Sequence, residues 1–181
     1  ITDMNQPLGM NVGNALEVKE AVELLSGKLP ETDPLYEVCM LLASQMLLLG
    51  DVVKSKEQAA ALLTQAIRSG AGLKKLQEMI AAQGGDASYL CVERIDELCR
   101  VTKHIDVPAK QSGYIREMNA SCIGLTAQML GAGRAEKSDP IDPAVGLVMH
   151  KRLMDTVTEG EPLCTLYVND ETRVQEAMEA L

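Results

Sequence analysis

The side chains that most often carry out catalysis are few and widely spaced in this chain of 181 residues. It has two histidines, His104 and His150, and neither stands near a second histidine or a cysteine at the spacing of a zinc site. We recognise no serine, histidine and aspartate set and no nucleophile-elbow pattern. From these residues alone we predict no catalytic residue and no substrate-binding residue within the chain.

One glycine-rich segment, Gly131-Ala132-Gly133-Arg134, could bring backbone N–H groups and a cation close to an anion. The same residues are typical of a glycine turn followed by a surface arginine, and we favour this second interpretation. His104 follows Lys103 in a stretch that alternates like a strand, so we interpret this histidine as an ordinary strand residue.

The amino-acid composition limits the kinds of molecule that the chain could bind. The chain has 17 basic and 26 acidic residues, which gives a formal net charge of −9. Phosphate groups are bound by Lys and Arg, and unpaired bases stack on aromatic rings, whereas this chain is acidic and only 2% aromatic. We therefore expect no nucleic-acid partner and no anionic membrane partner.

The cysteines indicate a reducing compartment. The 5 cysteines form no C-x-x-C pair, and most of them lie in apolar runs, so reduced and buried thiols are expected. We recognise no signal peptide and no apolar run of the roughly 18 residues that a membrane span needs. These features favour a cytoplasmic protein.

The first half of the chain has the periodicity of helices. Asn14 and Glu17 predict a capping box at the start of a helix that ends at Gly27. Asp33 followed by Pro34 predicts the start of a second helix, which is apolar nearly all round and should be buried. Two further helices are expected from Ser55 to about Gly70 and from about Leu73 to Gln83, and residues 86–100 are mixed.

The second half has the alternation of strands. Strands are predicted at 101–107, 113–118, 146–150 and 163–168. Asn119 should cap a helix that ends near Gly131, and Asp170 should cap a last helix to Leu181. The fold class is therefore α+β, with helices before a β-rich module and a boundary near residue 100.

Several blocks of residues together resemble one enzyme family. The first 20 residues join a polar extended start to a Pro-Leu-Gly turn, a second glycine and the helix GNALEVKEAVELL. The other blocks are Ala81–Asp86, Ser112–Ile115, Gly131–Ala135 and Ile141–Gly146. In this order they resemble the pyrimidine-nucleoside phosphorylases and their near relatives, the thymidine phosphorylases. In that family the opening block falls near the middle of the polypeptide, so the resemblance implies the C-terminal part of an enzyme.

The resemblance implies a fold and an activity. Residues 1–100 would form the helical part of a large α/β lobe, and residues 101–181 a mixed α/β barrel-sandwich module of hammerhead-like kind. The parent enzyme would be a pentosyltransferase that cleaves uridine or thymidine with phosphate to the free base and ribose or deoxyribose 1-phosphate. Much of the sheet that the helices cover would lie outside this chain. We therefore expect self-association or a complex with the complementary N-terminal half.

The resemblance also implies a cation site. The family holds a structural cation, expected to be potassium, and its ligands match the backbone carbonyls of Leu8 and Asn11 and the carboxylate of Glu20. The family's phosphate loop is of Lys-His-Ser-Thr-Gly-Gly type, whereas Lys103-His104 is followed by Ile105-Asp106. We therefore expect the isolated chain to lack phosphorolytic activity, with phosphate as co-substrate of the parent enzyme.

A second function remains open at this point. Residues 155–163 are similar to the strand–turn–strand of biotinyl and lipoyl carrier domains. A carrier needs an exposed lysine at a hairpin tip, and Lys151, the nearest lysine, lacks the usual Met-Lys or Asp-Lys motif. We interpret the similarity as one of architecture. The alternative to an enzyme part is a stand-alone interaction or carrier-like module on the same scaffold.

Overall fold

The structure, a computed structural model, describes residues 3–181. The described residues fall into two units: the first joins the residues up to Glu20 with Glu97–Leu181, and the second is Ala21–Asp96. The boundary between the units therefore lies within helix α1 (Asn14–Leu25). The predicted division into 1–100 and 101–181 refers to the parts of a larger protein and stays a prediction.

Helices make up most of the second unit, and local capping explains where they begin. They are α2 (Pro34–Leu49), α3 (Lys56–Arg68) and α4 (Ala71–Ala82), followed by a 3-10 turn η1 (Ala87–Tyr89) and, across the unit boundary, by η2 (Ile95–Cys99). Asp33 accepts a hydrogen bond from the backbone N–H of Leu35 at 2.8 Å, and Ser55 accepts one from Gln58 at 3.3 Å. These caps confirm the predicted starts of α2 and α3.

Helix α2 is partly exposed and partly half-buried in this chain, so the expectation that it is buried is wrong for the chain by itself. Ser44 is its one residue classed as buried. Leu41, Leu42, Met46 and Leu49 are 46% to 87% exposed. Apolar side chains on all sides of a helix indicate burial only if other elements surround it, and the described residues do not surround α2.

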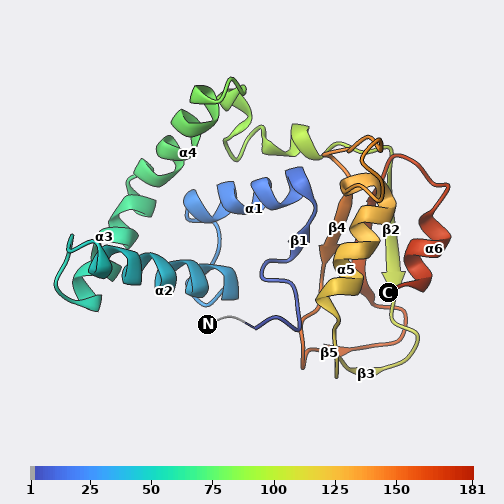
Figure 1. Ribbon diagram of the computed structural model, residues 1–181. Helices are drawn as coiled ribbons and strands as arrows, with labels where there is room; N and C mark the ends of the chain where they lie inside the picture. The colour runs from blue at the N-terminus through green and yellow to red at the C-terminus, as the bar shows by residue number, and fades with distance from the viewer. Residues whose placement is uncertain (1–2) are drawn as a thin grey trace. The chain divides into compact units, whose positions relative to one another are not determined.

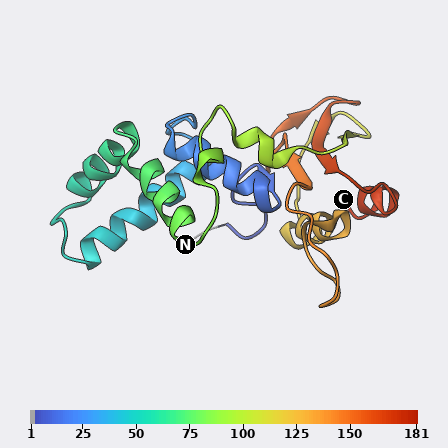
Figure 2. The same ribbon diagram turned by 90° about the horizontal axis from the view of Figure 1, so that it is seen from above.

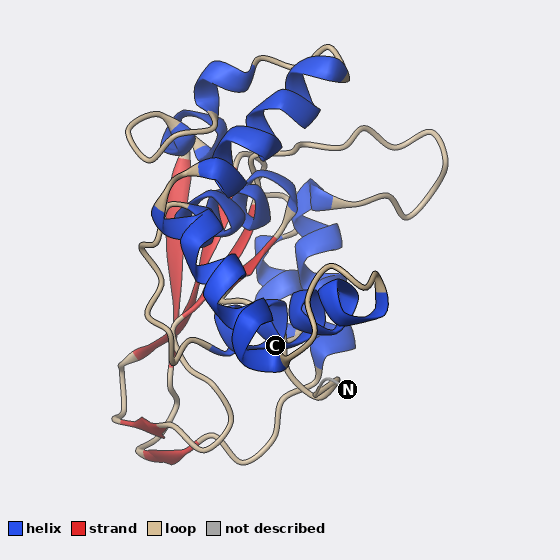
Figure 3. Cartoon of the chain, turned by 90° about the vertical axis from the view of Figure 1, so that its left-hand side faces the viewer, coloured by secondary structure: helices blue, strands red, loops and turns tan. Residues whose placement is uncertain are grey.

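An antiparallel sheet forms the centre of the first unit. Its strands are β1 (Asn11–Val12), β4 (Gly146–Met149), β6 (Pro162–Val168) and β2 (Lys103–Pro108), in that spatial order. Strands β3 (Gly113–Tyr114) and β5 (Thr156–Val157) form a separate pair beyond one end of this sheet (Figure 3). The register of β2 against β6 shifts between Val107 and Pro108 because proline cannot donate to the ladder.

The apolar face of the sheet is covered by helices (Figures 1 and 2). These are α5 (Ala120–Ala127), its π-helical continuation η3 (Gln128–Ala132) and α6 (Val174–Glu179). Leu147, Leu166 and Val168 from the strands are fully buried against Ile123 and Ala177. An antiparallel sheet with helices confirms the coarse α+β prediction, including the helix that Asn119 caps. Closure into a barrel sandwich goes further than this and stays a prediction.

Three local predictions were wrong in detail. Helix α1 begins one residue early, because Glu17 accepts from the N–H of Gly13 at 3.1 Å while Asn14 donates to the carbonyl of Ala132 at 2.7 Å. Asp170 accepts from Thr172 in a turn of its own, and α6 begins only at Val174. Strand β3 ends at Tyr114 instead of residue 118. None of the helices in residues 3–181 is long and apolar enough to cross a bilayer.

Candidate functional site

The first part of the site is the opening loop, by which we mean Pro7–Asn11, wrapped around the carboxylate of Glu20. Glu20 lies on α1 and is only 5% exposed. Its Oε1 accepts from the N–H of Met10 at 2.7 Å, and its Oε2 accepts from the N–H of Asn11 at 3.4 Å. A buried carboxylate needs such donors, because an unsatisfied charge would cost several kcal/mol. Glu20 is therefore part of the loop's structure and not a solvated residue on a helix face.

Gly9 makes this close approach possible. A Cβ atom built at Gly9 would lie 1.9 Å from Oε2 of Glu20 and 2.6 Å from its Cδ. The backbone thus forms a cradle that any side chain at this position would fill. The Pro-Leu-Gly turn in the sequence brings the chain round to the carboxylate that lies 11 residues further on (20 − 9).

Residues from the C-terminal part of the chain, within the first unit, also hold the opening loop. Arg152 donates to the carbonyl of Pro7 at 3.2 Å through Nη1 and to the carbonyl of Leu8 at 2.9 Å through Nη2. The N–H of Leu153 donates to the side-chain oxygen of Gln6 at 3.1 Å. Nothing in the sequence pattern predicted these contacts, because the partners are 144 to 147 residues apart.

Two of the three predicted cation ligands, Leu8 and Asn11, belong to the opening loop, and the third, Glu20, lies on α1 and contacts that loop. The carboxylate of Glu20 lies against the N–H of Asn11, and the carbonyl of Leu8 is in the same turn. Carboxylate and carbonyl oxygens are the hard ligands that an alkali cation prefers, so these residues fit such an ion in kind. These groups already contact N–H donors: Glu20 accepts from Met10 and Asn11, and Leu8 accepts from Arg152. Within residues 3–181, no three His, Cys, Asp or Glu side chains gather as a metal site. The cation itself stays a proposal.

The polar face of the sheet carries a hydrogen-bond chain that sequence reasoning missed. Thr165 on β6 donates to Oδ1 of Asp106 on β2 at 2.6 Å, and Nε2 of His150 lies 2.7 Å from the same hydroxyl. Because the single hydroxyl proton goes to Asp106, His150 does not act as a base toward Thr165. His104 lies in β2 and packs edge-on against Tyr167, with ring centroids 4.4 Å apart. No local pattern in the sequence indicates this hydrogen-bond chain, because Asp106 and Thr165 meet only through the pairing of β2 with β6.

Lys151 does not have the surroundings of a carrier lysine. Its Nζ forms an ion pair with Glu161 at 2.5 Å and donates to the carbonyl of Thr156 at 2.9 Å. The side chain is only 16% exposed. The hydrogen bond from Lys151 lowers the pKa of the Glu161 carboxyl. A paired and largely covered ammonium argues against covalent loading of a prosthetic group at this residue.

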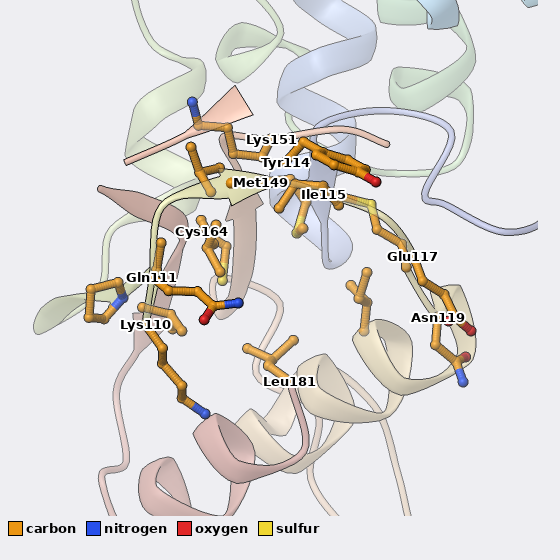
Figure 4. Close-up of a pocket in the computed structure, with 18 of the residues that line it drawn as sticks. Lys110, Gln111, Tyr114, Ile115, Glu117, Asn119, Met149, Lys151, Cys164 and Leu181 are labelled. Carbon is orange, nitrogen blue, oxygen red and sulfur yellow. The ribbon is translucent and has the colours of Figure 1, made fainter. Parts of the chain in front are cut away.

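A large apolar cavity of about 740 Å³ lies in the first unit, beside the loop that joins β2 to α5 (Figure 4). Met149 and Cys164 line it from the sheet, and Leu181 lines it from the C-terminal end. Burial and the Asp106 carboxylate raise the pKa of the Cys164 thiol to about 11, so this cysteine is a poor nucleophile. The walls are mainly apolar and hold no complete set for group transfer among the described residues.

Both halves of the chain match protein families. Residues 1–73 match the family described as Glycosyl transferase family, a/b domain, and residues 114–181 match Pyrimidine nucleoside phosphorylase C-terminal domain. The pyrimidine-nucleoside phosphorylase of Bacillus subtilis (strain 168) is 45% identical over 171 residues, which are 94% of this chain and 39% of that protein.

Two further relatives give the same result. The pyrimidine-nucleoside phosphorylase of Geobacillus stearothermophilus is 44% identical over 171 residues, 94% of this chain and 39% of that protein. That of Staphylococcus aureus (strain USA300) is 44% identical over 169 residues, 93% of this chain and 38% of that protein. The chain thus spans about two fifths of the length of these curated relatives.

Proposed function

Because the chain belongs to the pyrimidine-nucleoside phosphorylase family, we propose that it forms the C-terminal part of an enzyme that cleaves pyrimidine nucleosides with phosphate. The substrates would be uridine or thymidine, and the products the free base and ribose or deoxyribose 1-phosphate. The observation that carries the proposal is the 45% identity to the Bacillus subtilis enzyme over 94% of this chain. A cytoplasmic location is part of the proposal.

In this proposal the chain contributes structure around the reaction rather than the reacting groups. Phosphorolysis depends on positioning the nucleoside and phosphate and on stabilising their developing charge. The described residues offer no such constellation, so the phosphate loop and the base-binding residues would come from the remainder of the parent enzyme. Helices α2, α3 and α4 would cover the sheet of the large lobe, and residues 101–181 would form the barrel-sandwich module.

The opening loop would hold a potassium ion through the carbonyls of Leu8 and Asn11 and the carboxylate of Glu20. When bound, such an ion would supply positive charge next to the phosphate loop. The contribution of this chain is to fix the oxygens: Gly9 lets the loop close on Glu20, and the N–H groups of Met10 and Asn11 orient its carboxylate. The remaining ligands would come from outside the chain or from water.

The exposed apolar side chains of α2 support a partner surface in the same proposal. Met46 is 72% exposed and Leu49 is 87% exposed, and neighbouring leucines extend the patch. Exposed apolar patches of this kind mark surfaces that bind a partner. The occupant would be the complementary N-terminal part of the enzyme, or a second copy of the chain when that part is missing.

A hybrid enzyme tests the proposed function. The C-terminal segment of the Bacillus subtilis relative would be replaced by this chain, aligned over the 171 matched residues. We expect release of uracil or thymine that depends on phosphate. The control is the same hybrid with Glu20→Ala, which should fold and show lower activity with an altered dependence on potassium. A folded hybrid that binds nucleoside and phosphate but releases no base would contradict the proposal.

A further inference from the structure

We propose that Arg152 is a positioning residue that holds the opening loop in place from the β4–β5 connection of the first unit. The significance of this inference rests on the proposed function, because the loop it holds is the one that would carry the cation. The contacts themselves are independent of that function. They are two hydrogen bonds from one guanidinium to the consecutive carbonyls of Pro7 and Leu8, at 3.2 and 2.9 Å.

Two side chains of opposite charge bind the backbone N–H groups and the backbone carbonyls of the opening loop. On the N–H side, the carboxylate of Glu20 accepts from Met10 and Asn11. On the C=O side, the guanidinium of Arg152 donates to Pro7 and Leu8. Asn11 belongs to β1 and the carbonyl of Met10 accepts from the N–H of Met149, whereas Pro7–Gly9 lie outside the helices and strands. Hydrogen bonds to charged groups are stronger than those between neutral groups, so this pair of contacts should set the loop's conformation.

The planar guanidinium suits this task better than an ammonium would. Its N–H groups point in fixed directions, so Nη1 and Nη2 can reach two neighbouring carbonyls at once. The carbonyl oxygen of Leu8 keeps a second lone pair, because each carbonyl oxygen can accept twice. Arg152 can therefore orient Leu8 and still leave the oxygen able to ligate a cation. The Leu8 carbonyl would then already be held in position before a cation binds.

The segment that carries Arg152 is itself held in an unusual shape. Met154 adopts a φ of 72°, which is the left-handed region that residues with side chains rarely occupy. Its N–H donates to the carbonyl of Ile115 at 2.8 Å, and Asp155 accepts from the N–H of Arg152 at 2.7 Å. The turn directs Arg152 and Leu153 to the same neighbour, since Leu153 donates to Gln6.

Amide hydrogen exchange of the 181-residue chain, followed by NMR, tests the inference. The readouts are the N–H groups of Met10 and Asn11, and the N–H of Leu166 in β6 reports whether the sheet stays folded. In Arg152→Gln we expect the two loop amides to exchange at least about tenfold faster, since two charge-assisted hydrogen bonds are lost. Arg152→Lys should recover part of that protection, because the ammonium keeps the positive charge but cannot reach both carbonyls at once.

The matched control is Arg173→Gln, which removes an arginine whose guanidinium pairs with Glu176 on the surface of the same unit. It should leave the loop amides at the wild-type rate. Wild-type exchange of Met10 and Asn11 in Arg152→Gln, with Leu166 still protected, would overturn the inference. If Arg152→Gln unfolds the sheet, Arg152→Lys decides instead: loop amides that exchange at the wild-type rate beside a protected Leu166 would also overturn it. Because no turnover is measured, a failure here is distinct from a failure of the hybrid enzyme.

Discussion

At the scale of single residues, the position of the Glu20 carboxylate depends on the absence of a side chain at Gly9. An added methyl group at Gly9 would overlap the Glu20 carboxylate, whose Oε2 would be 1.9 Å away. We predict that Gly9→Ala displaces the carboxylate from the N–H groups of Met10 and Asn11 and lowers the free energy of unfolding of the first unit by roughly 1–3 kcal/mol. Urea titration followed by NMR signals of β6 would measure this.

Gly113→Ala is the control for that substitution. No atom lies within 4 Å of a Cβ built at Gly113, and Gly113 is not in the left-handed region. Its urea midpoint should stay within experimental error of the wild type. Equal midpoints for Gly9→Ala and the wild type would show that the Glu20 carboxylate does not stabilise the opening loop.

The cysteines should differ sharply in reactivity. The Cys164 thiol is 2% exposed and its pKa is raised to about 11, first by burial and then by the Asp106 carboxylate. Cys39, by contrast, is exposed. We predict that iodoacetamide at pH 8 modifies Cys39 and leaves Cys164 intact until urea unfolds the sheet, as peptide mass spectrometry would show. Modification of both thiols at similar rates in the native protein would contradict the packing of β6.

The same raised pKa predicts a pH dependence of stability. The folded-state pKa of Cys164, about 11, lies above its ordinary value of 9.0. The neutral thiol therefore stabilises the folded state fully below pH 9, and this contribution is lost as pH rises toward 11. We expect the urea midpoint of the first unit to fall between pH 9 and 11 by more in the wild type than in Cys164→Ala. Parallel curves for the two proteins would contradict this assignment.

Helix α2 carries the prediction that belongs to the scale of elements. Its side chains Met46 and Leu49 are highly exposed, so the isolated chain should self-associate through them. We predict that Met46→Glu or Leu49→Glu shifts sedimentation toward the monomer without lowering stability, because neither side chain is buried. Ala60→Glu, an equal charge change at an exposed position of α3, should leave self-association unchanged. A wild-type chain that sediments as a monomer and binds no apolar dye would contradict this prediction.

Helix starts were predictable where a local cap fixes them. Asp33 with Pro34 and Ser55 with Gln58 place α2 and α3 correctly, because a cap is a contact between residues a few positions apart. The predicted cap at Asp170 was wrong because its carboxylate accepts from the N–H of Thr172 and forms a separate turn. Helix α6 begins only at Val174. An Asx turn and a helix cap use the same side chain and the same donor type, and sequence alone does not separate them.

At the scale of the whole molecule, sequence reasoning identified the family and the residues of the opening loop, but not what surrounds the loop. The resemblance identified Glu20, and the structure buries it under the opening loop, while its role as a cation ligand stays a prediction. Arg152 was missed because it meets Leu8 across 144 residues of chain, through the pairing of β1 with β4. Such contacts follow from topology, which local propensities and spacings do not encode.

We propose that this chain is one part of a pyrimidine-nucleoside phosphorylase and needs the other part for activity. The most direct measurement is phosphate-dependent release of uracil from uridine and thymine from thymidine. It would be made with the purified chain alone, with the N-terminal part of the Bacillus subtilis relative alone, and with both mixed. We predict no release from either part and measurable release from the mixture, because positioning and charge stabilisation require the missing groups. Turnover that rises in proportion to the concentration of the chain alone would contradict the account, as would a stable complex of the two parts that shows no release.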